Sequence, residues 1–259
     1  MYRKFKFDKR IREGVTKLTG SWKIGEGGRL TPANPKGGRA IPWVFTHQDT
    51  RKKFCAHWNN VYCLTFNHIP TYCRFQCWKV VIKPRNLKET FLCHEIMVKM
   101  QHPGKIGMDL RNYTYGAWAG FFYNESLEQG REIYKIAREL IPDEIPVILK
   151  RGCTEMERMV PSPLWDNVSK EEVEFEERLN DIFSFDELNF SQADWLQSEI
   201  KERWIEYAIQ IGDPTAREMA EKYSDDPNIW EKLTVNSITY HDSDPREDLR
   251  KALQEQQEK

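Results

Sequence analysis

The segment Cys77–Glu89, CWKVVIKPRNLKE, predicts a β-strand that is followed directly by a helix. Residues 78–83 alternate between the two sides of an extended chain and are rich in valine and isoleucine, which is typical of a strand. Pro84 ends this strand, because proline has no N–H to donate to a neighbouring strand. Asn86 lies three residues before Glu89, which is the spacing of a helix N-cap. The segment therefore predicts the start of an α+β unit.

Downstream of this segment the period of the apolar residues switches between that of a helix and that of a strand. Ser126 and Gln129 repeat the N-cap spacing at the start of the second helix. The resulting order, strand-helix-strand-strand-helix-strand, is that of the ferredoxin-like split βαβ arrangement. We therefore predict an α+β fold with a ferredoxin-like βαββαβ core over residues 77–158. Its further elements are expected at 86–101 (helix), 106–110 and 117–124 (strands), 126–140 (helix) and 146–150 (strand).

Three regions of different composition flank this core. Residues 1–76 lack a clear period and are predicted to form an irregular, basic segment that contains a cysteine cluster, with an exposed loop over Gly25–Gly38. Residues 159–245 begin with a linker, PSPLWDN, and continue with acidic segments of helical period, which predict an acidic helical region. Residues 246–259 are polar and low in aromatic residues, and we expect them to be disordered.

Composition predicts a soluble protein of the reducing cytoplasm. Hydrophobic residues make up 39% of the chain, and the mean hydropathy is −0.72. The sequence has no run of about 18 apolar residues that would span a membrane, and the N-terminus lacks the apolar core of a secretory signal. The six cysteines are then expected to be reduced. A local group of reduced cysteines indicates a metal site or a reactive thiol rather than disulfides.

The net charge of −1 conceals a strong asymmetry between the two parts of the chain. Residues 1–153 contain 27 Lys and Arg against 13 Asp and Glu, whereas the remaining residues contain 12 against 27. A basic region of this kind predicts an anionic partner. The alternative is that the two regions differ only in surface charge and attract each other.

Four cysteines are predicted to meet at one edge of the core. In the predicted topology the first strand lies between the third and the fourth and is antiparallel to both. Cys77, at the start of the first strand, should therefore lie beside Cys153, just past the end of the fourth. Cys73 lies on the preceding turn, and Cys63 could arrive from the upstream loop. Four thiolates in a reducing compartment suit an iron–sulfur cluster or zinc.

We predict that these four cysteines bind a [4Fe–4S] cluster, because irregular spacings and ligands from distant loops are more usual for a cluster than for zinc. Zinc is the alternative metal, and Cys55, His57 and His68 are the reserve ligands. The simplest alternative is that the cysteines are buried free thiols, since cysteine is among the most buried residue types. In every case Cys93 is assigned to the helix core and His94 to the surface.

Basic and aromatic residues are interleaved around the cysteine region, which predicts contact with nucleic acid. Lysine and arginine bind phosphate, and aromatic rings stack on unpaired bases. The strand over 117–124 places Phe121 and Tyr123 on one face and Trp118 and Phe122 on the other. One face belongs to the core; the other is either exposed, as on the sheets of RNA-recognition motifs, or covered by the N-terminal segment or the acidic helices. The predicted nucleic-acid contacts are Arg51, Lys52, Lys53, Lys79, Lys83 and Arg85.

The hypothesis that these observations favour is a metal-binding protein that handles nucleic acid through its basic N-terminal half. One alternative is an iron–sulfur enzyme that acts on a small substrate by redox or Lewis-acid chemistry. Another is a non-enzymatic adaptor that binds a protein partner through its acidic helices, for which truncation at about residue 160 should abolish partner binding and leave a folded core. No residue is assigned a catalytic role, because the sequence contains no nucleophile elbow, no HExxH and no zinc-deaminase signature.

Overall fold

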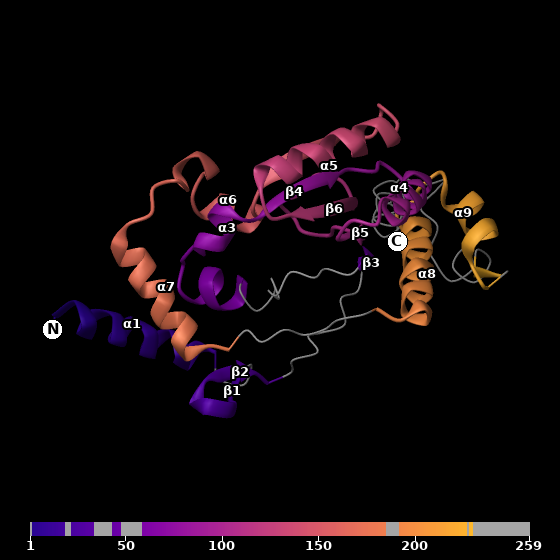
Figure 1. The fold of residues 1–259 in the computed structure, drawn as a ribbon. Coiled ribbons are helices and arrows are strands. Elements are labelled where there is room, and N and C mark those ends of the chain that lie inside the picture. Colours follow the sequence, from indigo (N-terminus) through magenta and orange to yellow (C-terminus); the bar gives the residue numbers. More distant parts are fainter. Residues whose placement is uncertain are drawn as a thin grey trace, which may run out of the picture.

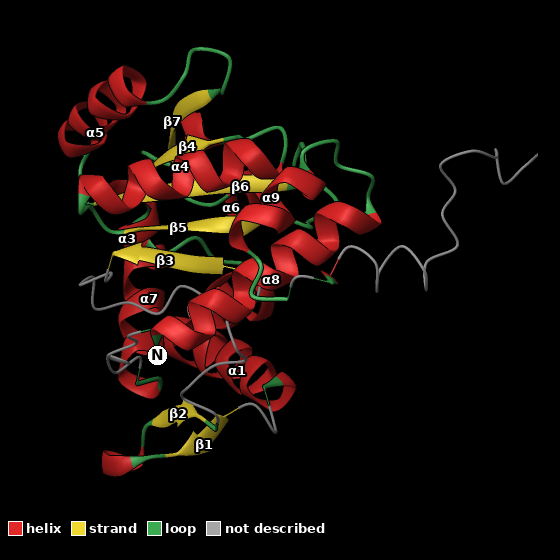
Figure 2. Cartoon of the chain, turned by 90° about the vertical axis from the view of Figure 1, so that its right-hand side faces the viewer, coloured by secondary structure: helices red, strands yellow, loops and turns green. Residues whose placement is uncertain are grey.

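A computed structural model describes residues 2–18, 22–33, 43–47, 59–184, 192–226 and 228–229. The structure mixes helix and sheet, and its centre is a five-stranded antiparallel sheet with the order β3-β5-β6-β4-β7 (Figures 1 and 2). As the sequence predicts, β4 lies between β6 and β7 and is antiparallel to both. The strands are β3 Trp43–His47, β4 Trp78–Ile82, β5 Gly104–Met108, β6 Trp118–Asn124 and β7 Val147–Arg151.

The two helices that connect these strands begin at the predicted caps. The Asn86 side chain accepts a hydrogen bond from the Glu89 N–H at 2.9 Å, and the Ser126 hydroxyl accepts one from the Gln129 N–H at 3.1 Å. Each bond satisfies a backbone donor that the first helical turn leaves unpaired. Both helices pack on one face of the sheet, and we call the opposite face the outer face. The helices are α4 Leu87–Met100 and α5 Leu127–Leu140.

The N-terminal region is more regular than the sequence predicts. It contributes β3 to the sheet, and its other described elements are α1 Tyr2–Lys17, β1 Trp22–Ile24, η1 Glu26–Gly28, β2 Leu30–Pro32, η2 Asn59–Thr65 and α3 Thr71–Phe75. The prediction of an irregular segment is therefore wrong for these residues. Where the side chains of α1 are described, Ile11 is buried between exposed charged residues such as Lys9 and Arg12, so the apolar period of this helix is hard to recognise in the sequence. Residues 25–33 of the predicted loop form a hairpin turn with β2, and residues 34–38 lie outside the described residues.

In the part of the predicted acidic helical region that the structure describes, there are three α-helices. Figure 1 shows two of them at one end of the molecule and the third beside α1 at the other end. The predicted linker before them is anchored, because Trp165 is fully buried and its Nε1 donates a hydrogen bond to the Val160 carbonyl at 2.7 Å. The predicted disordered tail, residues 246–259, lies outside the described residues. Between β7 and these helices lie α6 Thr154–Met159 and η3 Ser162–Leu164, and the three helices are α7 Lys170–Ile182, α8 Asp194–Gln210 and α9 Ala216–Tyr223.

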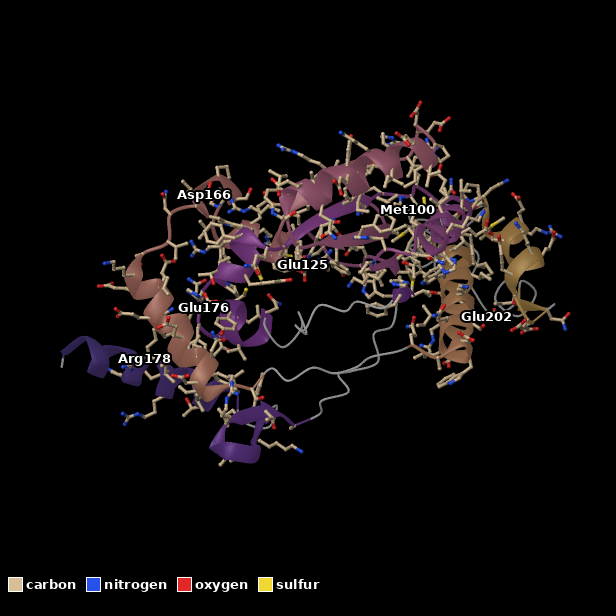
Figure 3. The ribbon with its side chains drawn as sticks, viewed as in Figure 1. Met100, Glu125, Asp166, Glu176, Arg178 and Glu202 are labelled. Carbon is tan, nitrogen blue, oxygen red and sulfur yellow. The ribbon has the colours of Figure 1, made fainter. Side chains whose placement is uncertain are left out.

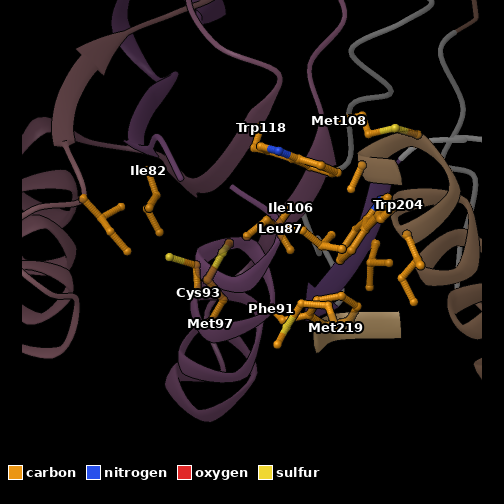
Figure 4. Packing of buried hydrophobic residues seen from close by; sticks show 14 of the residues in the cluster. Ile82, Leu87, Phe91, Cys93, Met97, Ile106, Met108, Trp118, Trp204 and Met219 are labelled. Carbon is orange, nitrogen blue, oxygen red and sulfur yellow. The ribbon is translucent and has the colours of Figure 1, made fainter. Parts of the chain in front are cut away.

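Helices α8 and α9 complete the hydrophobic core between α4 and the sheet. Trp204 of α8 is fully buried, with its ring centroid 5.8 Å from that of Phe91 and 6.4 Å from that of Trp118 (Figure 4). Tyr223 of α9 stacks on Phe91 with centroids 4.1 Å apart. In the sequence, Ile211 continues the apolar helical period of Trp204 and Ala208. It is nevertheless 48% exposed, because α8 ends one residue earlier.

The packing of α8 on α4 also buries His94, so the assignment of this residue to the surface is wrong. Its ring lies 6.3 Å from the Trp204 ring, and among the described residues its Nε2 atom has no hydrogen-bond partner. Cys93 beside it is fully buried in the core, as predicted.

A second hydrophobic cluster lies around α7. Phe175, Leu179 and Phe183 of this region pack with Ile11 of α1 and with Trp165. Both clusters therefore combine residues from the N-terminal region or the sheet with residues from the acidic helices.

Acidic side chains of α7 bind the segment around α3. Glu176 of α7, labelled in Figure 3, is buried and accepts hydrogen bonds from the Thr71 N–H at 2.8 Å and the Thr71 hydroxyl at 2.9 Å. His68 Nε2 lies 3.1 Å from the same carboxylate. One turn earlier, Glu172 pairs with Arg74 at 2.5 Å. These contacts connect the acidic part of the chain to its basic part.

Among the residues that the structure describes, no helix has both the length and the apolar character needed to cross a lipid bilayer.

Candidate nucleic-acid interface

Three of the predicted cysteine segments meet at Gly152. The Gly152 N–H donates a hydrogen bond to the Cys77 carbonyl at 2.7 Å, which continues the pairing of β4 with β7. A Cβ atom at Gly152 would lie 3.4 Å from the carbonyl oxygen of Cys73 and 2.5 Å from the Trp165 ring. The segments of Cys73, Cys77 and Cys153 therefore come together as the predicted topology requires.

The fourth predicted ligand, Cys63, comes from η2 and belongs to the same hydrophobic cluster as Cys73, with Cys153 packed against that cluster. Burial raises the pKa of the Cys63 thiol to about 12, and the neighbouring Cys153 and Glu155 add to this increase. Cys63 is thus a neutral thiol at physiological pH.

Of the three reserve ligands, the structure describes only His68. His68 is engaged with Glu176 in the α7 contact, and Cys55 and His57 lie outside the described residues. The sulfur of Cys153 accepts a hydrogen bond from Lys79 Nζ at 2.8 Å. Among the described residues, no group of three or more His, Cys, Asp or Glu side chains is arranged to hold a metal ion. The iron–sulfur or zinc site predicted at Cys63, Cys73, Cys77 and Cys153 remains a prediction.

The outer face of the sheet carries lysines beside aromatic rings. Lys105 Nζ of β5 lies 4.3 Å from the ring centroid of Trp43 and 5.7 Å from that of Phe121. Lys79 Nζ of β4 lies 5.7 Å from the ring centroid of Tyr123 on β6, its partner in the strand pairing. Because side chains alternate along a strand, these residues share one face.

Two of the six predicted nucleic-acid contacts are on or next to this face. Lys79 lies on it, and Lys83 follows β4 on the same side, with Nζ 4.0 Å from the Asp109 carboxylate. Arg85 is exposed and pairs instead with Glu89, its Nε donating to the carboxylate at 2.8 Å. Arg51, Lys52 and Lys53 lie outside the described residues.

Three further cations of this face were not predicted from the sequence: Lys105, Lys150 and Arg111. Lys150 of β7 is the strand partner of Lys79, which places both ammonium groups on the outer face. Arg111 follows β5 and binds Asp109 through two hydrogen bonds of 2.7 Å each. Alternation along β5 and β7 assigns Lys105 and Lys150 each to one face of its own strand. That the two faces are the same follows only from the register in which the strands pair.

A carboxylate network surrounds Arg111. Its Nη1 donates to Glu155 of α6 at 2.6 Å, and the Tyr113 hydroxyl donates to the same carboxylate at 2.9 Å. Burial alone would raise the pKa of Asp109, but its bonds to Arg111 and the charge of Lys83 outweigh burial and lower this pKa. The pKa of Glu155 is lowered in the same way, against the effect of burial, by a backbone hydrogen bond and by Arg111 and Tyr113. Both carboxylates are therefore ionised.

The outer face is covered over its central strands and more open towards β3. Lys79, Phe121 and Tyr123 are 8%, 9% and 8% exposed, whereas Trp43 and Lys105 are half-buried. Part of the cover is α6, whose Thr154 hydroxyl and Glu157 carboxylate contact Lys150. These strands are therefore covered, but the contacts come from α6, at the end of the predicted core, and not from the N-terminal segment or the acidic helices that the sequence suggested as the cover.

No protein-family model matches the chain, and comparisons with curated proteins and with solved structures found no significant match.

Proposed function

We propose that the protein binds single-stranded nucleic acid on the outer face of its sheet. The observation that carries this proposal is the position of Lys105, whose ammonium group lies beside the adjacent rings of Trp43 and Phe121. Ammonium groups attract the phosphate backbone, and aromatic rings beside them offer stacking surfaces for unpaired bases. Further cations lie on the same face: Lys79 on β4, Lys150 on β7 and Arg111 in the loop after β5.

The arrangement of the strands supports this proposal. We infer that β4–β7 with α4 and α5 form a ferredoxin-like core to which β3 is added at the edge next to β5. RNA-recognition motifs bind RNA on the face of such a sheet, through aromatic residues of its central strands. Here the central positions are taken by β6 and its two neighbours, and β6 supplies Phe121 and Tyr123 to the outer face. This support is an analogy at the level of the fold.

The test is a titration of a fluorescently labelled single-stranded oligonucleotide with the full chain, followed by anisotropy at several salt concentrations. We expect binding at low salt that weakens steeply as salt rises, because phosphate contacts release counterions. The double variant Trp43→Ala/Lys105→Gln should weaken binding by about tenfold or more, since one stacking contact contributes about 1–3 kcal/mol.

The matched control for this experiment is Lys135→Gln, which removes one exposed positive charge from α5 on the other side of the sheet. Its affinity should stay close to that of the wild type. The absence of binding at low salt, or equal losses in Lys135→Gln and the double variant, would count against the outer face as the binding site.

A second proposal concerns the cysteines, because the segments of Cys73, Cys77 and Cys153 meet at Gly152 with Cys63 in the same cluster. We propose that a [4Fe–4S] cluster, or else zinc, is bound here with Cys55 as a further candidate ligand. In a reducing cytoplasm, which we also propose as the location, such ligands stay reduced. Protein prepared without oxygen should then contain metal and, for a cluster, absorb broadly near ~400 nm. A metal-free and colourless but folded preparation would leave the cysteines as buried thiols.

The enzyme and adaptor hypotheses depend on other features. An iron–sulfur enzyme requires the same cysteine site and an iron that a small substrate can reach, so the metal measurement tests it first. An adaptor requires an exposed partner surface on the acidic helices, and Trp195 of α8, which is 64% exposed, is the position that supports it. Loss of a protein partner in Trp195→Ala, with nucleic-acid binding unchanged, would favour the adaptor.

A further inference from the structure

Helix α6 crosses the outer face directly after β7 and contacts cations from three different elements. The sulfur of Cys153, at its N-terminal boundary, accepts from Lys79 of β4 at 2.8 Å. The Thr154 hydroxyl accepts from Lys150 of β7 at 2.9 Å.

The carboxylates of the same helix continue this series. Glu155 accepts from Arg111, in the loop after β5, at 2.6 Å, and Glu157 pairs with Lys150 at 3.2 Å. Four of the five positions from 153 to 157 therefore meet a cation of the proposed interface. The fifth, Met156, is 2% exposed and packs in the cluster around α7.

The acceptors that α6 offers resemble those of a phosphate backbone. Two carboxylates, a hydroxyl and a sulfur provide electron pairs to lysine and arginine, as phosphate oxygens do in a nucleic-acid complex. Lys79 lies at the start of β4, beside the end of β7. Strand β5 runs parallel to β4, so the loop after β5, with Arg111, lies at the opposite end of the strands. The acceptors of α6 therefore reach cations at both ends of the strands. The cations that would bind phosphate are thus already occupied within the chain.

The loop between β5 and β6 is part of the same cover. The Tyr113 hydroxyl donates to Glu155 at 2.9 Å, and the Arg158 guanidinium lies 4.5 Å from the centroid of the Tyr113 ring. On the same face, Phe121 and Tyr123 of β6 are buried. The more open part of the outer face, with Trp43 and Lys105, lies towards β3.

We propose that α6 is an autoinhibitory cover that occupies the phosphate positions of the outer face and that nucleic acid displaces it. This inference rests on the proposed function. Binding begins at Trp43 and Lys105 and spreads to Lys79 and Lys150 as α6 is released. The ionic contacts of α6 are only partly buried, so water and salt weaken them and a polyanion can compete for the same cations.

The test compares the affinity of three proteins for one labelled single-stranded oligonucleotide. Glu155→Gln/Glu157→Gln weakens the cover, and Glu132→Gln/Glu139→Gln makes the same charge change at exposed positions of α5. We expect the α6 variant to bind roughly fivefold more tightly than the α5 variant, from two partly exposed ion pairs. Equal affinities of the two variants, with wild-type binding intact, would overturn the cover and leave the proposed function standing. If none of the three proteins binds, the proposed function itself is wrong.

Hydrogen exchange tests the same inference on the wild-type protein, with no substitution. The N–H groups of Glu157 and Val160 are bonded within α6, to the carbonyls of Cys153 at 3.1 Å and Met156 at 3.0 Å. Saturating oligonucleotide should speed exchange at both amides if α6 is displaced. Unchanged or slower exchange at these amides, in a protein that binds the oligonucleotide, would show that α6 stays in place.

Discussion

At the scale of single residues, His94 shows how packing overrides the character of a side chain. A histidine on a helix, next to a charged residue such as Glu95, would ordinarily face water. In α4, however, His94 is covered by Trp204 of α8. Burial lowers the pKa of His94 from 6.5 to about 4; the positive charge of Lys201 on α8 contributes in the same direction, and Glu95 opposes it. The ring is therefore neutral in the folded protein at pH 7.

This burial predicts a pH dependence of stability. Between pH 6.5 and pH 4 the unfolded chain holds a proton on His94 that the folded chain lacks, so the free energy of unfolding decreases as pH falls through this window. The contribution of His94 at pH 4.5 is about 2–3 kcal/mol relative to pH 7.5. Urea unfolding at the two pH values should show a smaller loss for His94→Leu than for the wild type.

The exposed His47 provides the control for this measurement. His47→Gln should lose as much stability as the wild type between pH 7.5 and pH 4.5, because the carboxylates that also titrate in this window are common to all three proteins. An identical pH dependence in His94→Leu and the wild type would show that the imidazole is not buried as described.

Gly152 is the residue on which the meeting of the cysteine segments depends. Its φ of +60° favours glycine, and a Cβ atom there would lie 2.5 Å from the Trp165 ring. Gly152→Ala should therefore lower the free energy of unfolding by about 2–4 kcal/mol, from backbone strain and overpacking together. Gly116 has a φ of +73° and no atom within 4 Å of such a Cβ, so Gly116→Ala isolates the backbone term of about 1 kcal/mol. Equal losses in thermal unfolding of the two variants would refute the close contact with Trp165.

At the scale of elements, α7 is attached to α3 through a buried carboxylate. Burial alone would raise the pKa of Glu176, but hydrogen bonds from His68 and Thr71 outweigh it and lower this pKa. Glu176→Ala leaves the partly buried Thr71 N–H and the buried His68 without their acceptor, so we expect a loss of about 2–4 kcal/mol in the free energy of unfolding. The neighbouring Glu177 is exposed, and Glu177→Ala should change stability by less than about 0.5 kcal/mol. Similar denaturation midpoints for the two variants would argue against this attachment.

The elements that the sequence predicts well are those whose ends and period are both marked. The helices after Asn86 and Ser126 begin at these residues, because a side chain that caps a helix acts locally and needs no tertiary context. The strands of the core were predicted for the same reason, since each combines an apolar period of two with a turn signal.

The elements that the sequence does not predict depend on long-range packing. Helix α6 has six residues, which is too short for a period, and its position is decided by contacts with Lys79, Lys150 and Arg111. The covered outer face was one of two alternatives because alternation in β6 assigns Phe121 and Tyr123 to a face and does not show what lies over it. The predicted meeting of Cys77 with Cys153 followed from strand order alone, which is why it was accessible from the sequence.

At the scale of the whole molecule, the charge asymmetry is used at least in part for internal contacts. Glu172 of α7 pairs with Arg74, and Glu218 of α9 pairs with Lys88 at 2.7 Å. Asp213, before α9, accepts a hydrogen bond from the first N–H of α4, that of Leu87, at 2.7 Å. The acidic region thus satisfies donors and cations of the basic region, as the simpler interpretation of the asymmetry expects.

These contacts change the expected result of truncation at residue 160. The shortened chain would lose Trp204 from the core between α4 and the sheet, and Phe175 and Leu179 from the cluster around α7. Apolar surfaces of the sheet and of α1 would then face water. We therefore predict that residues 1–160 do not form a folded core, contrary to the expectation from the sequence. The near-ultraviolet circular dichroism of the buried tryptophans should be lost, and unfolding should no longer be cooperative.

A chain that ends at residue 245 is the appropriate control, since it removes only the polar tail. Its near-ultraviolet spectrum and melting temperature should match those of the full chain. If the chain of residues 1–160 instead kept a cooperative transition, the helices after residue 160 would be dispensable for the fold. An aromatic side chain in a core buries about 200 Å² of surface. The contacts of Trp204 with Phe91 and Trp118 would then stabilise the fold by less than this area implies.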